Sequence, residues 1–281
     1  MLSKYNNEQL KKVLDIVKKA ASPDKIFLLG AAENCHMVAS LFNTRPEMHR
    51  QITHYYLMVL TRSRDNRCFD ALQDVIESRC RHATPITVFI EAVHVFNHWI
   101  NAGHPFACQV VKNGILVYDA GVAPLDAPAA NCMEADITQQ VKEFNRWNKQ
   151  VIEFLAGTEL YLLRKQFGLS AFLLHQAAEH TCTILLKMMT GYRASTHSLD
   201  KLLRYCQPFS AELVSLFPRD NEKENYLFGL LQKAYVHGRY RDDYNITEKE
   251  LRILAGRVTR LQGIMREMAK RKFGLAGSGG A

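Results

Sequence analysis

From residue 136 to residue 272 the apolar residues of this chain recur at helical spacing almost without interruption. Residues three and four positions apart share one face of a helix, so each such segment carries an apolar stripe that must pack against another helix. Thr247, with Glu250 three residues further on, has the pattern of a capping box at a helix start. The pattern predicts an up-and-down bundle of five helices, over Asp136–Lys165, Gly168–Met189, Leu199–Phe217, Asn221–His237 and Thr247–Lys272.

The second of these segments shows the stripe most clearly. Its apolar positions recur at intervals of three and four residues, and they are Ala171, Leu174, Ala178, Cys182, Leu185 and Met189. We expect this stripe to be buried in the bundle.

The first part of the chain has a different pattern. Short apolar runs at Lys25–Gly30, His54–Thr61 and Pro85–Ile90 predict buried strands. Amphipathic segments at Asn7–Ala20 and Asp65–Arg81 predict helices. Helices that alternate with strands are typical of a layer of helices packed on a sheet.

One more local signal lies in the segment Val110–Tyr118. There the dipeptide Asn113-Gly114 stands between two apolar runs, which is the strongest short-range signal of a β-hairpin. Together these patterns predict an α+β chain, with a small mixed sheet in the first domain and an all-α bundle in the second.

The two patterns are separated by residues 121–130, GVAPLDAPAA, which contain two prolines and show no periodic spacing of apolar residues. Such a segment is typical of a linker. We therefore expect an α/β domain over residues 1–125, a linker over 126–135, a helical bundle over 136–273 and a flexible tail over 274–281.

The positive charge of the chain is concentrated in its second part. The formal net charge is +8, and residues 136–281 hold 22 basic against 15 acidic residues. A basic domain favours acidic partners such as nucleotides or nucleic acid. Much of the charge lies on the last helix, where it can also be an ordinary solvated face.

The cysteines and the N-terminus indicate the cellular environment. Seven cysteines is an odd number, and none of them forms a CxxC pair. Reduced thiols in a cytosolic protein fit this pattern best. The first twenty residues lack the apolar run of a signal peptide, and nowhere do eighteen apolar residues run together. We expect a cytoplasmic protein with no membrane partner.

Three segments of the helical part resemble the HEPN family. They are Ala171–His180, AFLLHQAAEH, then Thr196-His197-Ser198-Leu199, and then Ala234–Tyr244, AYVHGRYRDDY. The resemblance implies a helical bundle that binds a nucleotide of the ATP or GTP kind, or RNA. It also implies a homodimer, in a setting similar to toxin–antitoxin pairs.

The resemblance points to two groups of binding residues. Arg239 and Arg241 can fork onto phosphate oxygens, and Tyr240 and Tyr244 can stack on a base. In the alternative interpretation, Arg239 pairs with Asp242 or Asp243 and the tyrosines fill the end of the bundle.

The second group lies earlier in the chain. His175, Gln176 and Glu179 fall on a more polar flank of the second helix, and Thr196-His197 caps the next helix, as in relatives.

The family also contains ribonucleases, in which an arginine is followed four to six residues later by a histidine that acts as acid or base. No histidine follows Arg239 in this chain, and Arg193 precedes His197, with three residues between them, in the wrong helix-loop position. A metal-independent ribonuclease would need a rearranged site, with His237 and Arg239 as its catalytic residues. Binding without turnover is therefore the leading hypothesis, ribonuclease the alternative, and a non-catalytic scaffold the third class.

The first domain resembles a nucleotidyltransferase that has lost its catalytic residues. In that family a glycine-serine pair follows the first strand, and two aspartates on the second strand bind metal ions. Here Ala31 follows Gly30, and His54-Tyr55-Tyr56 stands where the aspartates belong. Glu91 falls at about the place of a third carboxylate, but one carboxylate cannot hold two Mg²⁺ ions. The rival interpretation is an unrelated small α/β domain.

We expect no metal and no cofactor. Glu91, His94 and His98 would share one face if they lay on a single helix, and could then bind zinc, but no fourth ligand is recognisable. No P-loop, dinucleotide-binding or nucleophile-elbow motif occurs, so the kinase, dehydrogenase and hydrolase interpretations lose their main support.

Overall fold

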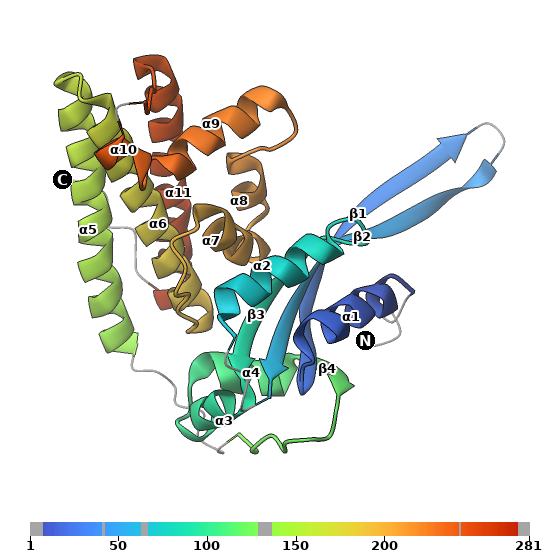
Figure 1. Ribbon diagram of the computed structural model, residues 1–281. Coiled ribbons are helices and arrows are strands. Elements are labelled where there is room, and N and C mark those ends of the chain that lie inside the picture. The colour runs from blue at the N-terminus through green and yellow to red at the C-terminus, as the bar shows by residue number, and fades with distance from the viewer. Residues whose placement is uncertain (1–7, 41–42, 63–66, 129–136, 242, 275–281) are drawn as a thin grey trace. The chain divides into compact units, whose positions relative to one another are not determined.

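The computed structural model describes residues 8–40, 43–62, 67–128, 137–241 and 243–274. The chain forms two compact units, residues 1–133 and 134–281. Most of the expected linker and nearly all of the expected tail lie outside the described residues, and the domain limits expected from the sequence stay a prediction. A mixed sheet in the first unit and helices in the second confirm the α+β fold class (Figure 1).

The first unit is built on a four-stranded sheet in the order β3-β2-β1-β4. β1 pairs antiparallel with β2 and with β4, whereas β2 and β3 are parallel. The sheet is therefore mixed, as predicted. The strand bounds are β1 Lys25–Ser40, β2 Asn43–Thr61, β3 Ile86–Ala92 and β4 Ile115–Asp119.

Helices accompany this sheet, with bounds α1 Glu8–Ala21, α2 Phe69–Cys80, α3 Val93–Asn101 and α4 Pro105–Asn113. α1 and α2 pack together, and Val13, Val17 and Ile76 are fully buried in one core with the strands. The helices and strands predicted between residues 7 and 90 are all present, although β1 and β2 extend beyond the predicted runs.

The predicted hairpin at Asn113-Gly114 is wrong. α4 begins with Pro105 in its first turn and buries Phe106, Ala107, Cys108 and Val110 at helical spacing. Gly114 ends this helix, and its N–H donates to the carbonyl oxygen of Val110 at 2.8 Å. The Asn-Gly pair is thus a helix terminus rather than a two-residue turn, because the apolar run before it has helical and not strand periodicity.

The second unit is entirely helical in its described part. Its helices are α5 Ile137–Leu163, α6 Phe167–Thr190, α7 Leu199–Cys206, α8 Ala211–Leu216, α9 Glu222–Lys233, α10 His237–Tyr240 and α11 Glu248–Phe273. α6 is the central helix and contacts α5, α7, α9, α10 and α11 (Figure 1). Of its predicted apolar stripe all but Met189 is buried, and Met189 is half-buried.

Two of the five predicted helices are interrupted. The helix predicted over Leu199–Phe217 ends at Cys206, because Pro208 lacks the N–H that a continuing helix needs. A 3₁₀ turn and α8, which Ser210 caps, follow instead. The helix predicted over Asn221–His237 ends at Lys233, and the short α10 carries His237. The capping box of Thr247 and Glu250 is present at the start of α11, as predicted.

Candidate functional site

The sequence places His175 and Glu179 on a more polar flank of α6, and in the structure both side chains are buried. His175 is 1% and Glu179 8% exposed, whereas Gln176 is half-buried. Both residues are covered by elements that follow later in the chain, the loop before α7 and the segment after α9. Buried polar groups need partners, so the contacts of these side chains define the site.

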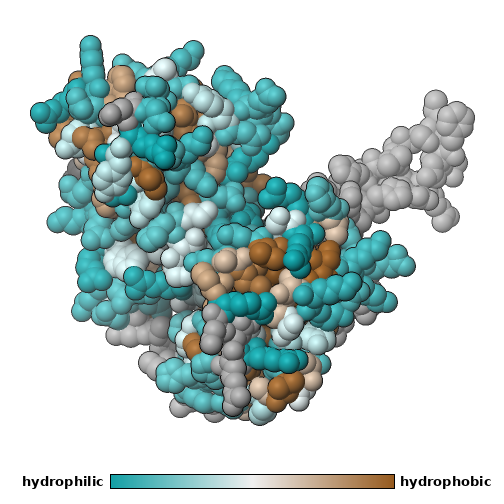
Figure 2. Space-filling model, in the orientation of Figure 1, coloured by the Kyte–Doolittle hydropathy of each residue, from teal (hydrophilic) through white to brown (hydrophobic). Residues whose placement is uncertain are grey.

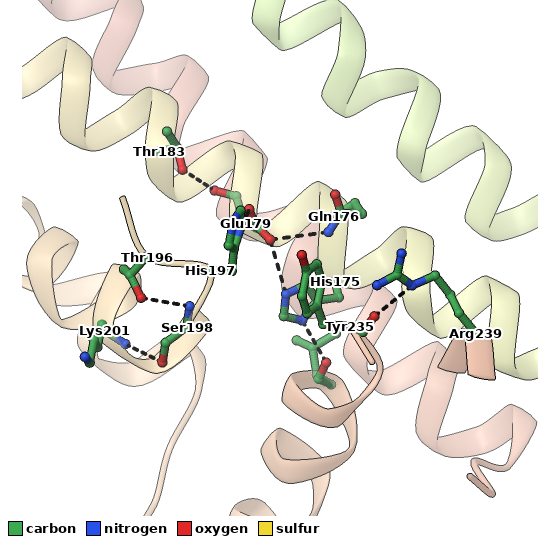
Figure 3. Close-up of polar contacts among 11 residues, drawn as sticks. His175, Gln176, Glu179, Thr183, Thr196, His197, Ser198, Lys201, Tyr235 and Arg239 are labelled. Atoms are coloured by element: carbon green, nitrogen blue, oxygen red, sulfur yellow. Dashed lines mark hydrogen bonds and ion pairs between the residues drawn. The ribbon is translucent and has the colours of Figure 1, made fainter. Parts of the chain in front are cut away.

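The Glu179 carboxylate is the centre of these contacts (Figure 3). Its Oε1 lies 2.9 Å from Nδ1 of His197, and its Oε2 accepts a hydrogen bond from Nε2 of Gln176 at 3.3 Å. Nε2 of His175 lies 3.4 Å from the same Oε2. One carboxylate thus organises side chains from α6 and from the loop 191–198.

The position of the proton on His175 follows from its other contact. Nδ1 lies 3.0 Å from the carbonyl oxygen of Leu231, which can only accept, so Nδ1 carries a proton. Nε2 then faces the Glu179 carboxylate, and it makes no hydrogen bond of good geometry within the described residues. His175 therefore ties α6 to the end of α9 and leaves one nitrogen beside a negative charge.

Glu179 is ionised more readily than an ordinary glutamate. Burial opposes its ionisation, but the contacts of His175 and His197 with the carboxylate outweigh that effect and lower its pKa. The site therefore holds a buried carboxylate that stays negative at neutral pH.

His197 is the exposed member of the site. Its side chain is 64% exposed, and its ring stacks on Tyr235 with a centroid distance of 5.5 Å and an interplanar angle of 10°. Because Nδ1 lies against Glu179, its proton is held there and Nε2 remains available to a ligand. The expected helix cap is wrong in detail, since Ser198 caps α7 and Thr196 accepts a hydrogen bond from the Ser198 N–H.

Arg239 lies beside this group, on a platform of aromatic rings. Its guanidinium is 4.5 Å from the ring centre of Phe172, 4.7 Å from that of Tyr240 and 5.1 Å from that of Tyr235. Its Nε donates to the carbonyl oxygen of Tyr235 at 2.9 Å. We call Phe172, Tyr235, Arg239 and Tyr240 the Arg239 cluster.

The alternative interpretation, in which Arg239 pairs with an aspartate, finds no support in the described residues. Asp243 lies 3.9 Å from Arg241 instead, and Asp242 is outside the described part of the chain. Within that part Arg239 has no carboxylate partner, and its side chain is exposed. A guanidinium in this state keeps its hydrogen-bond donors for a ligand.

Two glycines set the position of Arg239 against α6. A Cβ atom at Gly238 would lie 2.7 Å from the carbonyl oxygen of Gly168, and one at Gly168 would lie 3.0 Å from the carbonyl oxygen of Gly238. The backbones of α10 and the first turn of α6 therefore approach more closely than any side chain permits. This contact brings Arg239 over Phe172.

Several large apolar side chains of the segments around this cluster are exposed. Figure 2 shows apolar groups interspersed with hydrophilic ones at the end of the bundle where α5 ends and α6 begins. Leu160, Leu163, Leu169 and Val236 are exposed there.

The remaining predicted residues lie in different environments. Tyr240 is 74% exposed and belongs to the Arg239 cluster, whereas Tyr244 is half-buried and donates its hydroxyl to the carbonyl oxygen of Leu230 at 2.9 Å. Burial raises the pKa of Tyr244. His237 is half-buried, and its ring makes no hydrogen bond or ion pair with the rest of the described chain.

Two residues of the site were missed by the sequence analysis. Tyr235 stacks on His197, lies 5.3 Å from the ring of His175 and supports Arg239, while Phe172 forms the other side of the platform. Both lie inside the segments that carried the family resemblance, so their spacing to His175 and Arg239, three and four residues, could have found them.

The sheet of the first unit gives the positions of the nucleotidyltransferase-like residues. Gly30 pairs with Tyr56 across β1 and β2, and the residue beside Tyr56 on β3 is Thr87. Glu91 lies beside Leu60, about 13 Å further along the strand at the usual rise per residue. Glu91, expected after the third strand, therefore lies within β3 and four residues along the sheet from the level of Tyr56.

The potential zinc ligands do not share a helix face. Glu91 lies in β3, and its carboxylate accepts a hydrogen bond from the N–H of Ala92, whereas α3 begins at Val93. Burial raises the pKa of Glu91. In the described part of the chain, no group of three or more histidine, cysteine, aspartate or glutamate side chains could hold a metal ion. None of the described helices combines the length and apolar character needed to cross a membrane.

Comparison with known proteins identifies the second unit. Residues 144–268 match the model of the HEPN domain, which confirms the resemblance seen in the sequence. No curated protein matches the chain.

Proposed function

Since the second unit of this chain is a HEPN domain, we propose that it binds a nucleotide or RNA at the Arg239 cluster. The observation that carries this proposal is an exposed guanidinium on three aromatic rings, with no carboxylate partner in the described chain. Phosphate oxygens would accept from the guanidinium, and a base would stack on Tyr240.

Six other arginines of the domain give this observation its weight. Carboxylates pair with Arg204, Arg219, Arg241, Arg252, Arg257 and Arg260. Surface ion pairs of this kind contribute little to stability, and the charge of a paired arginine is already compensated. Arg239 differs from them in being held by rings and a backbone carbonyl, both of which leave its charge uncompensated.

Nucleotide transfer by the first unit is not part of this proposal. The positions that would hold two metal ions carry His54, Tyr55 and Tyr56, and Glu91 lies too far along the sheet to help. Two-metal chemistry needs several carboxylate oxygens around the phosphates. The first unit, if it descends from a nucleotidyltransferase, serves in another role.

Ribonuclease activity is the second candidate, and one observation favours it. Glu179 fixes Nδ1 of His197, and the exposed imidazole stacks on Tyr235, the ring that also contacts Arg239. An imidazole oriented by a carboxylate can act as a general base, and an arginine held at the same ring can bind phosphate. His197 fits that role better than His237, the histidine proposed from the sequence, because no carboxylate in the described chain orients His237. A scaffold role would use neither His197 nor Arg239. Homodimerisation of the HEPN domain is compatible with binding, with cleavage and with a scaffold role.

Arg239→Ala is expected to weaken binding of fluorescently labelled ATP, GTP or RNA at least tenfold. A charge-assisted hydrogen bond contributes about 1.5–3 kcal/mol, and 1.4 kcal/mol is a factor of ten in affinity. Equilibrium anisotropy measures this loss. Arg252→Ala is the matched control, since Arg252 is also exposed but pairs with Glu248, and it should leave affinity within twofold.

The same samples test the alternatives. RNA cleavage in the presence of a chelator, lost in His197→Ala, would establish the ribonuclease. Equal affinity of wild type and Arg239→Ala for every ligand would refute binding at this cluster.

A further inference from the structure

A second cluster of cations and an aromatic ring lies on the HEPN domain, away from Arg239. Nζ of Lys187 is 5.3 Å and the guanidinium carbon of Arg193 is 5.8 Å from the ring centre of Trp147. Trp147 is half-buried and Arg193 exposed. We call Trp147, Lys187 and Arg193 the Trp147 cluster.

The two cations of this cluster differ in their availability. Lys187 is already paired with Glu143 at 2.6 Å, and this pairing lowers the pKa of Glu143. Arg193 has no carboxylate partner in the described chain. Arg193 and Arg239 are thus the two described arginines of the domain that rest on an aromatic ring without a carboxylate. Arg219, which also lies over a ring, pairs with Asp200.

One stripe of α6 joins the two clusters. Phe172 belongs to the Arg239 cluster and Lys187 to the Trp147 cluster, and they are fifteen residues apart on the same helix. The positions between them at intervals of three and four residues are Gln176, Glu179 and Thr183. Such positions fall on one face of a helix. Glu179 is buried, and the other members of the stripe are half-buried.

The loop 191–198 connects the clusters a second time. It carries Arg193 against Trp147 and, four residues later, His197 against Glu179 and Tyr235. The stripe of α6 and this loop therefore place polar side chains between the two clusters, together with the buried carboxylate of Glu179.

The length of the stripe decides which ligand can use both clusters. Fifteen residues of helix correspond to about 22 Å. A stacked strand advances about 3.4 Å per nucleotide, so this length accommodates about six stacked nucleotides. A single nucleotide held at Arg239 cannot also reach Arg193.

We infer that the HEPN domain binds a single-stranded oligonucleotide along α6, from the Arg239 cluster to the Trp147 cluster, rather than a mononucleotide alone. This inference rests on the proposed function and names its ligand class. Aromatic rings and unpaired arginines at both ends suit bases that are not paired with a second strand. RNA and single-stranded DNA share this chemistry, and the 2′-hydroxyl distinguishes them.

The test compares ligands of different length by fluorescence anisotropy at one salt concentration. The ligands are labelled ATP and two dodecamers of uridine or thymidine, as RNA and as DNA. Arg193→Ala should lower the affinity for the preferred dodecamer at least tenfold and leave the affinity for ATP within twofold. Arg239→Ala should lower the affinity for both ligands. Arg252→Ala should change neither affinity, because Arg252 is ion-paired on α11. The dodecamer that binds more tightly identifies the sugar.

The outcomes separate this inference from the proposed function. If Arg239→Ala lowers the affinity for the dodecamer and Arg193→Ala does not, the inference of an extended site is wrong and the proposal of binding at Arg239 stands. If wild type binds no ligand, or if Arg239→Ala changes nothing, both fail.

A spectroscopic readout is independent of affinity. The chain has two tryptophans, and Trp99→Phe leaves Trp147 as the only one. Its fluorescence should change with the dodecamer and not with ATP. The same response to both ligands would contradict the inferred path along α6.

Discussion

His175→Ala is expected to lower the free energy of unfolding by about 3 kcal/mol, because the variant leaves a cavity, an unpaired carbonyl and a carboxylate with one partner fewer. His175 is almost fully buried, donates from Nδ1 to Leu231 and lies beside Glu179. Urea unfolding followed by circular dichroism measures the loss. Nucleotide or RNA affinity should fall as well, since Glu179 and Tyr235 both lose a neighbour.

His180→Ala is the matched control for this prediction. His180 is on the same helix and only half-buried, and its ring packs edge-on against the ring of Phe154. The free energy of unfolding should fall clearly less in His180→Ala than in His175→Ala. His175→Asn, which keeps an N–H donor in the side chain, should recover part of the stability. Equal losses of unfolding free energy in the two alanine variants would show that His175 only fills space and that its polar contacts do not stabilise the domain.

Gly238→Ala should produce the second large effect, a destabilisation of about 1–3 kcal/mol together with loss of nucleotide or RNA binding. The added methyl group meets the backbone oxygen of Gly168, which cannot move as a side chain can. α10 must therefore shift away from α6 and carry Arg239 off Phe172. Thermal unfolding and anisotropy on the same preparation measure the two effects.

Gly256→Ala provides the comparison for that variant. Gly256 lies inside α11, and nothing is within 4 Å of a Cβ atom built there. Because alanine has a higher helix propensity than glycine, this variant should be stabilised by up to about 1 kcal/mol and bind normally. A Gly238→Ala variant that behaved the same way would show that the close contact of α10 with α6 is unimportant.

Much of this fold follows from periodicity. The apolar stripe of α6 and the capping box at Thr247 were both visible in the sequence, and the structure has them where they were predicted. Long segments with one clear period are decided by local physics, because a single face must be buried.

The errors have local causes as well. Asn113-Gly114 was interpreted as a hairpin turn, yet Pro105 and the buried residues after it make the preceding run a helix. Pro208 was overlooked inside a predicted helix that it interrupts. In both cases a proline was the deciding residue, and it outweighed the pattern around it.

The site was harder to predict, because its contacts join residues far apart in sequence. His175, Gln176, Glu179 and His197 were candidates, but their convergence on one carboxylate depends on how the loop before α7 folds over α6. The burial of Glu179 could not be inferred from α6 alone, since the residues that cover it come later in the chain. Periodicity places residues on one face of one element, and it carries no information about the segment that packs there.

The central claim is that the HEPN domain holds its ligand at the Arg239 cluster. Photo-crosslinking tests it most directly, with a uridine dodecamer that contains 4-thiouridine, followed by mass spectrometry of the crosslinked peptides. We predict crosslinks to peptides that contain Tyr235 or Tyr240, competed by unlabelled RNA and lost in Arg239→Ala but kept in Arg252→Ala. Crosslinks confined to residues 1–133 would contradict the account.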